Sequence, residues 1–257
     1  MIRARHFYLG TAAAVGVAAL VVTPFETRAQ NANAVAIDND DIGGVVRSPS
    51  GFEAGVWVIA ETRDLPTRFT RSVVTDDQGR YVLPDLPKGK YKVWVRGYGL
   101  VDSAKVDGEP GQQINLTAVP APNEVAAAQY YPAIYWYAMM KMPGADQFGG
   151  KSDIPANVSQ IEWIGYLKGS QCIGCHQLGN LATRTIPKEF GDFKDSVEAW
   201  MRRTQSGQAG EMMTNTLAGL LGGAPYKYLA DWTDRIAKGE LPPAKPPRPS
   251  GVGGLSR

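Results

Sequence analysis

The chain has 257 residues, of which 44% are hydrophobic and 20% are charged, and its formal net charge is +2. This composition is ordinary for a folded protein, and it excludes disorder of the whole chain and nucleic-acid binding driven by bulk charge. Because the chain has only two cysteines and two histidines, most zinc sites and most histidine-based hydrolytic sites are excluded as well.

Residues 1–29 predict a secretory signal peptide. Arg3 and Arg5 give a basic start, residues 9–22 form an apolar run, and residues 27–29 (Thr-Arg-Ala) place small side chains where a signal peptidase cleaves. The apolar run of about 14 residues is shorter than the roughly 20 that a membrane span needs, and a retained anchor is the alternative. We therefore expect a periplasmic or secreted bacterial protein that touches a membrane only through an uncleaved leader.

The charge of the remaining chain is balanced. Removal of residues 1–29 leaves 24 basic and 24 acidic residues, and His176 as the single histidine. A balanced chain does not steer a charged partner over long range, so we expect no nucleic-acid partner.

Residues 38–119 predict an all-β domain. Val56, Val58 and Ala60 alternate with larger or polar neighbours, which is the period of two that half-buried strands show. Turn-forming clusters such as residues 76–79 (Asp-Asp-Gln-Gly) separate the apolar runs. The spacing predicts an antiparallel sandwich of short strands. The expected strands are 42–47, 56–62, 69–75, 80–83, 91–97, 101–106 and 113–116.

Residues 75–93, together with the glycine-rich start from Gly43 to Val46, resemble the carboxypeptidase regulatory-like domain. The resemblance covers about 80 residues and implies a prealbumin-like β-sandwich without catalytic residues of its own. Two roles stay open for such a domain: a spacer that holds its neighbour, and a module that docks a partner protein or a glycan.

Residues 120–152 predict a linker or strap with a short helix at 123–130. Tyrosine, tryptophan and methionine residues gather at 130–142, and prolines interrupt the segment. Such a cluster is typical of core or interdomain packing, and the wall of a cofactor site is the alternative.

The sequence Cys172-Ile173-Gly174-Cys175-His176 is the attachment signature of c-type haem. Two thiols must reach the two vinyl groups of one ring, and a histidine that follows at once brings its imidazole to the iron. Assembly of such a site also needs an export signal, which residues 1–29 provide.

The residues of this motif have three other interpretations. A thioredoxin-like redox pair lies at a βα junction, and no such pattern surrounds Cys172 and Cys175. A structural zinc site needs four ligands, whereas only three cysteines and histidines remain after the leader. A plain disulfide is the third possibility for an exported chain.

The second axial ligand of the iron is expected to be a methionine, because no second histidine remains. Met201 fits the buried face of a predicted helix and so is expected in the core. Met212 and Met213 follow a glycine-containing loop, residues 206–210, that can approach a flat ring. Because neighbouring side chains point in different directions, only one of them can bind, and we favour Met213 with Met212 as the alternative. An iron with no methionine ligand stays open.

Residues 153–241 predict an all-α domain with helices near 157–168, 193–205 and 225–238, and a methionine-bearing segment at 211–221. This order resembles class I cytochrome c. The resemblance implies one covalently attached haem c, with Cys172 and Cys175 as thioether anchors, His176 as proximal ligand and Met213 as distal ligand.

The last segment, residues 242–257, is rich in proline and predicts an extended spacer. The whole order resembles bacterial exported proteins in which these two domains precede a virginiamycin B lyase-like β-propeller, and this chain is then a shortened member or a fragment. We expect a monohaem electron carrier with no catalytic residues, or alternatively a haem-bearing acceptor subunit. Its expected partner is a redox protein, either a periplasmic dehydrogenase or a propeller protein. The third hypothesis is a haem sensor joined to a binding module.

Overall fold

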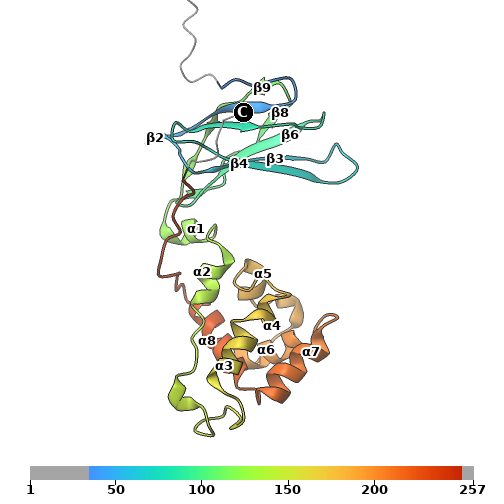
Figure 1. Ribbon diagram of the computed structural model, residues 1–257, viewed down its shortest axis with the longest axis vertical. Coiled ribbons are helices and arrows are strands. Elements are labelled where there is room, and N and C mark those ends of the chain that lie inside the picture. Colours follow the sequence, from blue (N-terminus) through green and yellow to red (C-terminus); the bar gives the residue numbers. More distant parts are fainter. Residues whose placement is uncertain (1–34, 251–257) are drawn as a thin grey trace, which may run out of the picture. The chain divides into compact units, whose positions relative to one another are not determined.

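A computed structural model of the chain describes residues 35–250 (Figure 1). The predicted signal peptide, residues 1–29, and residues 251–257 of the tail lie outside the described residues. Across residues 35–250, no helix has the length and apolar character that crossing a membrane requires.

The first half of the described chain consists of strands, as predicted. The longer strands agree with the expected ones to within a residue at either end. The strands are β1 (Ile42–Ser48), β2 (Gly51–Phe52), β3 (Trp57–Thr62), β4 (Phe69–Val74), β5 (Arg80–Leu83), β6 (Tyr91–Arg96), β7 (Leu100–Val101), β8 (Val106–Gly108), β9 (Gln112–Gln113), β10 (Leu116–Thr117) and β11 (Val119–Pro120).

The strands form two main sheets. One has the order β4-β3-β6-β8 and is antiparallel throughout. The other is built around β1, which pairs antiparallel with β2 and β5 but parallel with β9 and β10. The prediction of a wholly antiparallel sandwich was therefore wrong. Because the chain passes through the other sheet before it returns beside β1, it can return in the same direction, as parallel pairing requires.

Two predicted strands are each split into two short ones. In the segment between β7 and β8, the Ser103 hydroxyl accepts a hydrogen bond from the Val95 N–H at 3.0 Å, in the place of a backbone carbonyl. Between β9 and β10, the Asn115 side chain accepts from the Val45 N–H at 3.0 Å. Side chains that replace backbone partners interrupt the ladder, and periodicity alone does not reveal them.

The sandwich core confirms the predicted alternation. Val58, Ala60, Val93 and Val95 are fully buried. The core cluster comprises Ile42, Val46, Val56, Val58, Ala60, Tyr81, Leu83, Leu86, Tyr91, Val93, Val95, Leu100, Ile114, Leu116 and Ala118. Trp94 on the opposite face is also buried, with the Lys105 ammonium 3.9 Å from its ring centre.

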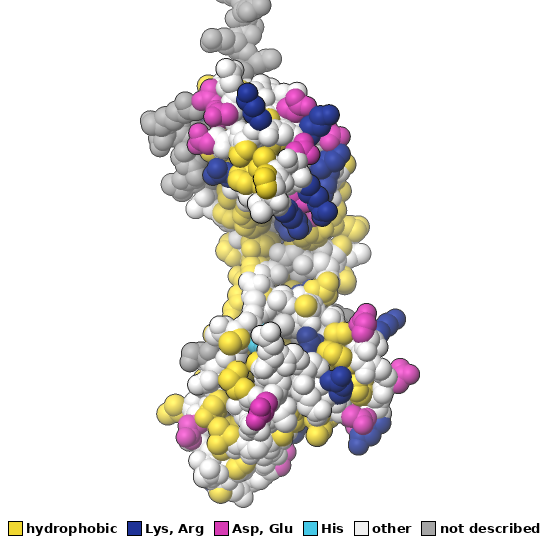
Figure 2. All heavy atoms as spheres, turned by 90° about the vertical axis from the view of Figure 1, so that its right-hand side faces the viewer, with side chains coloured by type: hydrophobic (Ala, Val, Ile, Leu, Met, Phe, Trp, Pro, Cys, Tyr) yellow, Lys and Arg dark blue, Asp and Glu magenta, His cyan; other side chains and the backbone are white. Residues whose placement is uncertain are grey.

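Basic and acidic side chains both lie on the sandwich surface that faces the viewer in Figure 2. Ion pairs such as Arg68–Glu61 and Arg96–Asp102 join groups of opposite sign within the sandwich. This mixture agrees with the balanced charge of the sequence.

Among the described residues, those after β11 form helices and no strands. The helical segments are α1 (Glu124–Ala128), α2 (Ala133–Ala138), η1 (Ala145–Gln147), α3 (Gln160–Leu167), α4 (Ser170–Ile173), α5 (Leu181–Arg184), η2 (Lys188–Phe190), α6 (Ser196–Thr204), α7 (Gly210–Thr214), the π-helix η3 (Asn215–Leu220) and α8 (Pro225–Ala237).

Three tryptophans, Trp136, Trp163 and Trp232, are fully buried in the core of the helices. The Trp232 indole N–H donates to the Trp136 carbonyl at 2.8 Å, so α8 is joined to α2. Most of the aromatic and methionine residues of the predicted strap pack into this same core, as the packing interpretation expected: Tyr131, Trp136, Tyr137, Met139, Met140 and Met142.

Local sequence signals explain where two of the predicted helices begin or end. At the start of α3, Ser159 and Glu162 form a capping box. At the end of α8, Gly239 adopts a φ of +94°, and the Gly239 and Glu240 N–H groups donate to the Ile236 and Arg235 carbonyls at 2.9 and 3.0 Å. This is a Schellman motif, which satisfies the last carbonyls of the helix.

The expectation that Met201 lies in the core was wrong, because its side chain is 43% exposed. The buried face of α6 is formed by Ala199, Trp200 and Thr204. Ala199 extends this face on one side, and Met201 falls beyond its other edge.

The proline-rich segment has no regular secondary structure up to residue 250. The Arg248 guanidinium pairs with the buried Glu53 carboxylate at 2.5 Å and donates to the Tyr98 carbonyl at 3.0 Å. The tail thus contacts residues of the sandwich.

Candidate functional site

One cavity among the helices has a volume of about 340 Å³ and is lined by the site residues that the sequence predicted. Its volume lies within the range of about 300–1,000 Å³ that ligand pockets show. It is lined by Tyr137, Leu167, Gln171, Cys172, Cys175, His176, Leu178, Thr183, Phe190, Trp200, Arg203, Thr204, Ser206, Gly207, Ala209, Met212, Met213, Thr216, Leu217 and Leu229. Apolar and aromatic side chains predominate, and the polar groups are few.

One wall carries the Cys-x-x-Cys-His motif at the end of α4. The Cys175 and His176 N–H groups donate to the Cys172 carbonyl at 3.4 and 3.1 Å, so the three residues share one helical turn. Cys172 is half-buried, Cys175 is exposed, and neither forms a disulfide. Burial and then the nearby Cys175 raise the pKa of the Cys172 thiol, which favours its protonated form.

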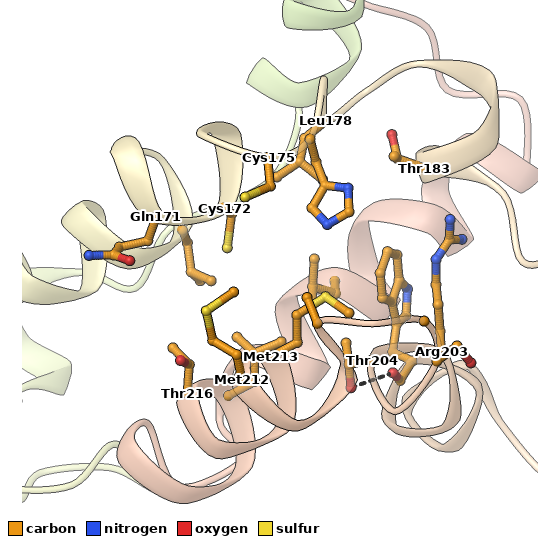
Figure 3. A pocket seen from close by; sticks show the side chains of 18 of the residues that line it. Gln171, Cys172, Cys175, Leu178, Thr183, Arg203, Thr204, Met212, Met213 and Thr216 are labelled. Atoms are coloured by element: carbon orange, nitrogen blue, oxygen red, sulfur yellow. Dashed lines mark hydrogen bonds between the residues drawn. The ribbon is translucent and has the colours of Figure 1, made fainter.

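The facing wall is formed by α7 and the π-helix that continues it. Figure 3 shows Met212 and Met213 rising from α7 toward the wall that holds Cys172 and Cys175. The Leu221 N–H donates to the Thr216 carbonyl five residues earlier at 3.0 Å, as in a π-helix. π-helical segments are rare and occur frequently at functional sites.

The two methionines differ in their surroundings. Met212 is 57% exposed and lines both the cavity and a separate open hollow on the outer surface. Met213 is half-buried and lines the cavity but not the hollow. The predicted loop before them, residues 206–210, brings Ser206, Gly207 and Ala209 to the cavity wall.

Arg203 closes one end of the cavity. Its guanidinium donates to the carbonyls of Ala182 and Thr185 and lies 5.0 Å from the centre of the Trp200 ring. Burial lowers the pKa of Arg203. These contacts connect α6 to the segment around α5.

The loop after the motif is fixed against α2 by Gly179. Its φ is +96°, and a Cβ at this position would lie 2.0 Å from the Ala133 carbonyl oxygen. The Gly179 N–H donates to the Thr183 hydroxyl at 2.9 Å, and its carbonyl accepts from the Arg184 guanidinium at 2.8 Å. The chain is therefore held in place within three residues of His176.

Tyr137 of α2 contributes a buried hydroxyl to the cavity lining. Within the described part of the chain, this hydroxyl has no hydrogen-bond partner. Burial and then the nearby Cys172 raise the pKa of Tyr137 well above its ordinary value, so the hydroxyl stays protonated and can donate.

The structure brings together every site residue that the sequence predicted: Cys172, Cys175, His176, Met213 and the alternative Met212. Tyr137, Phe190, Trp200 and Leu229 were not predicted as site residues. Their sequence signal is that of helix core or loop packing, and only the way the helices meet turns them toward the cavity.

The donor atoms suit a large planar group better than a single bound ion. In residues 35–250, only Asp38, Asp40 and Asp41 bring three potential ligand atoms within 4.8 Å of one another, so the cysteines and His176 do not converge on one point. Two thiols, one imidazole and two thioethers instead surround an apolar space. This donor set, spread over two facing walls, fits a haem held through both sulfurs and the imidazole.

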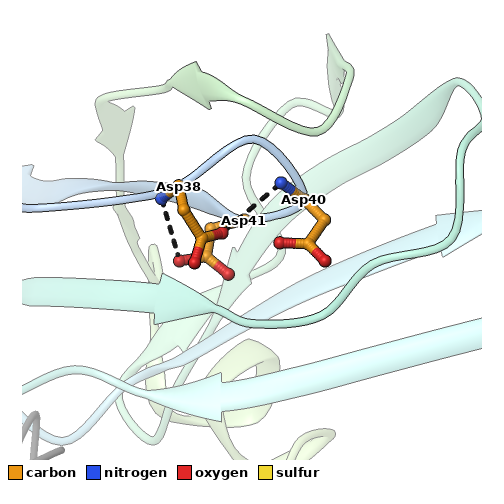
Figure 4. A group of neighbouring side chains, drawn as sticks. All are labelled: Asp38, Asp40 and Asp41. Carbon is orange, nitrogen blue, oxygen red and sulfur yellow. Dashed lines mark hydrogen bonds between the residues drawn. The ribbon is translucent and has the colours of Figure 1, made fainter.

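The three aspartates near the start of the sandwich are explained by a turn (Figure 4). The Asp41 carboxylate accepts from the N–H groups of Asp38 and Asp85 at 3.2 and 3.3 Å, and the Asp38 carboxylate accepts from the Asp40 N–H at 3.4 Å. A side-chain hydrogen bond and the charge of Asp38 raise the pKa of Asp40. This cluster organises the entry into β1.

Comparison with solved structures gives only distant likenesses. Two mutants of a type II Cohesin-X-Dockerin complex from Acetivibrio cellulolyticus match at 15% and 14% identity over 34% of this chain and 62% of theirs, each with a TM-score of 0.25. The match thus spans less than two thirds of those chains. A 9R-lipoxygenase from Cyanothece PCC8801 matches at 15% identity over 39% of this chain and 22% of its own, with a TM-score of 0.21.

Comparison with families is more specific. No curated protein matches the chain. Residues 41–120 match the carboxypeptidase regulatory-like domain, and they coincide with the strands from β1 to β11. Residues 41–120 are therefore a carboxypeptidase regulatory-like domain with a β-sandwich fold.

Proposed function

We propose that this protein is an extracytoplasmic carrier of single electrons, with one haem c bound covalently in the helical cavity. Cys172 and Cys175 are the anchors, His176 is the proximal iron ligand and Met213 is the distal ligand. The observation that supports this most strongly is that one apolar cavity is lined by all of these residues, although they come from segments about 40 positions apart.

The cysteines attach the group by addition. Each thiol would add across one vinyl group of the haem: its S–H bond would break, a C–S bond would form, and the hydrogen would pass to the other vinyl carbon. The reaction needs no oxidant or reductant, but both thiols must be reduced. The unpaired state of Cys172 and Cys175 meets this requirement.

The remaining residues of the cavity orient the group and exclude water. His176 would offer a ring nitrogen to the iron, and Met213 would offer a thioether sulfur. The bound haem would supply one reversible electron at its iron. Trp200, Leu217 and Leu229 provide a low-dielectric wall that limits solvent rearrangement when the charge changes.

Met213 is preferred to Met212 as the distal ligand because of its burial. A thioether that binds iron is shielded from water by the group it binds and by the protein behind it. Met213 is half-buried inside the cavity, whereas Met212 is shared with the outer surface.

We propose that the sandwich holds the haem domain in place and takes no part in the chemistry. A redox partner, such as a periplasmic dehydrogenase or a propeller protein, would approach the helical part near the motif.

A pyridine haemochrome spectrum of the exported protein tests the proposal. The protein is produced in a bacterium that assembles c-type cytochromes, and the spectrum is expected to show about one haem with two thioether links. The double variant Cys172→Ser/Cys175→Ser should lose covalent haem, whereas Met201→Leu, at an exposed position outside the cavity, should retain it. A wild-type protein without covalent haem would reject the proposal.

A further inference from the structure

Tyr137 is the unusual polar residue of the cavity. Its side chain is only 2% exposed, yet its hydroxyl has no partner among residues 35–250. A buried polar group without a hydrogen bond destabilises the folded protein, because it has lost its contacts with water and gained none. Such a group in a ligand cavity calls for an explanation other than packing, because phenylalanine would pack equally well.

The other buried tyrosines show what is missing at Tyr137. Tyr81 donates to the Ile114 carbonyl at 2.6 Å, and Tyr91 donates to the Pro87 carbonyl at 2.8 Å. The Tyr226 hydroxyl pairs with that of Thr204 at 3.0 Å. Two indole N–H groups, those of Trp94 and Trp163, are also unpartnered in the described chain, but neither lines the cavity.

The ring of Tyr137 is fixed, so its hydroxyl cannot turn toward solvent. The ring packs edge-to-face on Trp232 with 5.8 Å between the centres. The Lys168 ammonium lies 4.5 Å from the ring centre and donates to the Tyr137 carbonyl at 2.9 Å.

We propose that Tyr137 donates a hydrogen bond to an acceptor of the haem bound in this cavity, and that it thereby positions the group and tunes its reduction. Tyr137 and Cys172 line the same cavity and come from different helices, α2 and α4. This inference rests on the proposed function, because it needs a haem in the cavity.

The expected effect has a definite sign. A hydrogen bond donated to the haem stabilises the form with more electron density, which is the reduced form. Removal of the hydroxyl therefore makes the haem harder to reduce. A whole hydrogen bond changes an equilibrium constant by about tenfold, and only the part of its strength that differs between the two forms counts here, so the equilibrium constant for reduction should fall by about threefold.

The test compares Tyr137→Phe with Tyr228→Phe in the loaded protein. Tyr228 belongs to the same helical core and donates to the Gln147 side chain at 2.7 Å, but it does not line the cavity. Tyr137→Phe removes a hydroxyl that has no protein partner, so it should not impair folding. The equilibrium with a one-electron mediator of known potential gives the constant for each protein.

We expect a fall of about threefold for Tyr137→Phe and a change of less than twofold for Tyr228→Phe. An unchanged constant in a fully loaded Tyr137→Phe protein, or an equal fall in both variants, would overturn the role of Tyr137 and leave the proposed function intact. If the wild-type protein carries no covalent haem, the proposed function fails and this inference fails with it.

Discussion

At the scale of single residues, the choice between two neighbouring methionines determines how the site behaves. Met213→Leu should retain covalent haem, because Cys172 and Cys175 are untouched. It should lose the weak long-wavelength absorption of a methionine–iron bond in the oxidised protein. Its reduction potential should also fall, because thioether ligation raises the potential.

Met212→Leu is the matched control for this prediction, since it makes the same change one residue away. Its oxidised spectrum and potential should equal those of the wild type. If Met212→Leu loses the absorption band and Met213→Leu retains it, the assignment is reversed.

The site residues that lie within one short motif could be predicted from the sequence, whereas those that lie far from the motif could not. Cys172, Cys175 and His176 stand within five positions, so their spacing alone indicates their chemistry. Tyr137 lies 35 positions before the motif in a segment of ordinary packing residues, and its role depends on a hydrogen bond that is missing. No pattern in the sequence encodes that absence.

At the scale of elements, the loop after the motif depends on Gly179. Gly179→Ala would place a methyl group against the Ala133 carbonyl and also force an L-residue to a φ of +96°. We expect a loss of unfolding free energy of about 3 kcal/mol or more, because overpacking adds to the backbone strain. Urea unfolding of the exported protein gives the value.

Gly191→Ala separates the two contributions. Gly191 has a φ of +100°, but a Cβ there would meet nothing within 4 Å. It should therefore cost only the backbone strain, about 1–2 kcal/mol. Equal losses in the two variants would show that the close approach of the loop to α2 has no energetic weight.

The hydrogen bonds at the start of α3 should make the free energy of unfolding depend on pH. The Ser159 N–H and hydroxyl donate to the Glu162 carboxylate at 2.8 and 2.7 Å, and these bonds lower the pKa of Glu162. The stabilisation is therefore complete above about pH 4.5, the ordinary glutamate value, and is lost as the pH falls through the lowered pKa.

The difference in unfolding free energy between wild type and Glu162→Ala should accordingly shrink from neutral pH toward pH 3. Gln160→Ala, on the same first turn, provides a control without a titrating group. A difference for Glu162→Ala that stays constant with pH would contradict the role of the charged capping box.

Elements were predictable where caps and periodicity agreed. The predicted helix 225–238 agrees with α8 to within one residue, and Gly239 follows it directly. The predicted helix 157–168 began three residues too early, because the capping box of Ser159 and Glu162 was not recognised. The π-helix after Met213 was not predicted, because its widened turn arises from packing against neighbouring helices. The prediction that Met201 lies in the core was wrong, because helical periodicity does not fix where the buried face of a helix ends.

At the scale of the whole molecule, the two halves differ in how much of their structure could be predicted from the sequence. Residues 41–120 follow a family pattern, so their sandwich was predicted together with most of its strands. The parallel pairing of β1 with β9 and β10 was missed, because it depends on the path of the chain between the sheets. In the helical half, the motif could be predicted from the sequence but the cavity could not, because the cavity emerges only when the helices are assembled.

The central claim is that a single haem is bonded to both cysteines of this chain. The most direct test is the intact mass of the exported protein after denaturation and acid-acetone extraction, which removes haem that is not covalently bound. We predict the mass of the polypeptide plus one haem, and the mass of the bare polypeptide for Cys172→Ser/Cys175→Ser. A wild-type protein with the mass of the bare polypeptide would contradict the account.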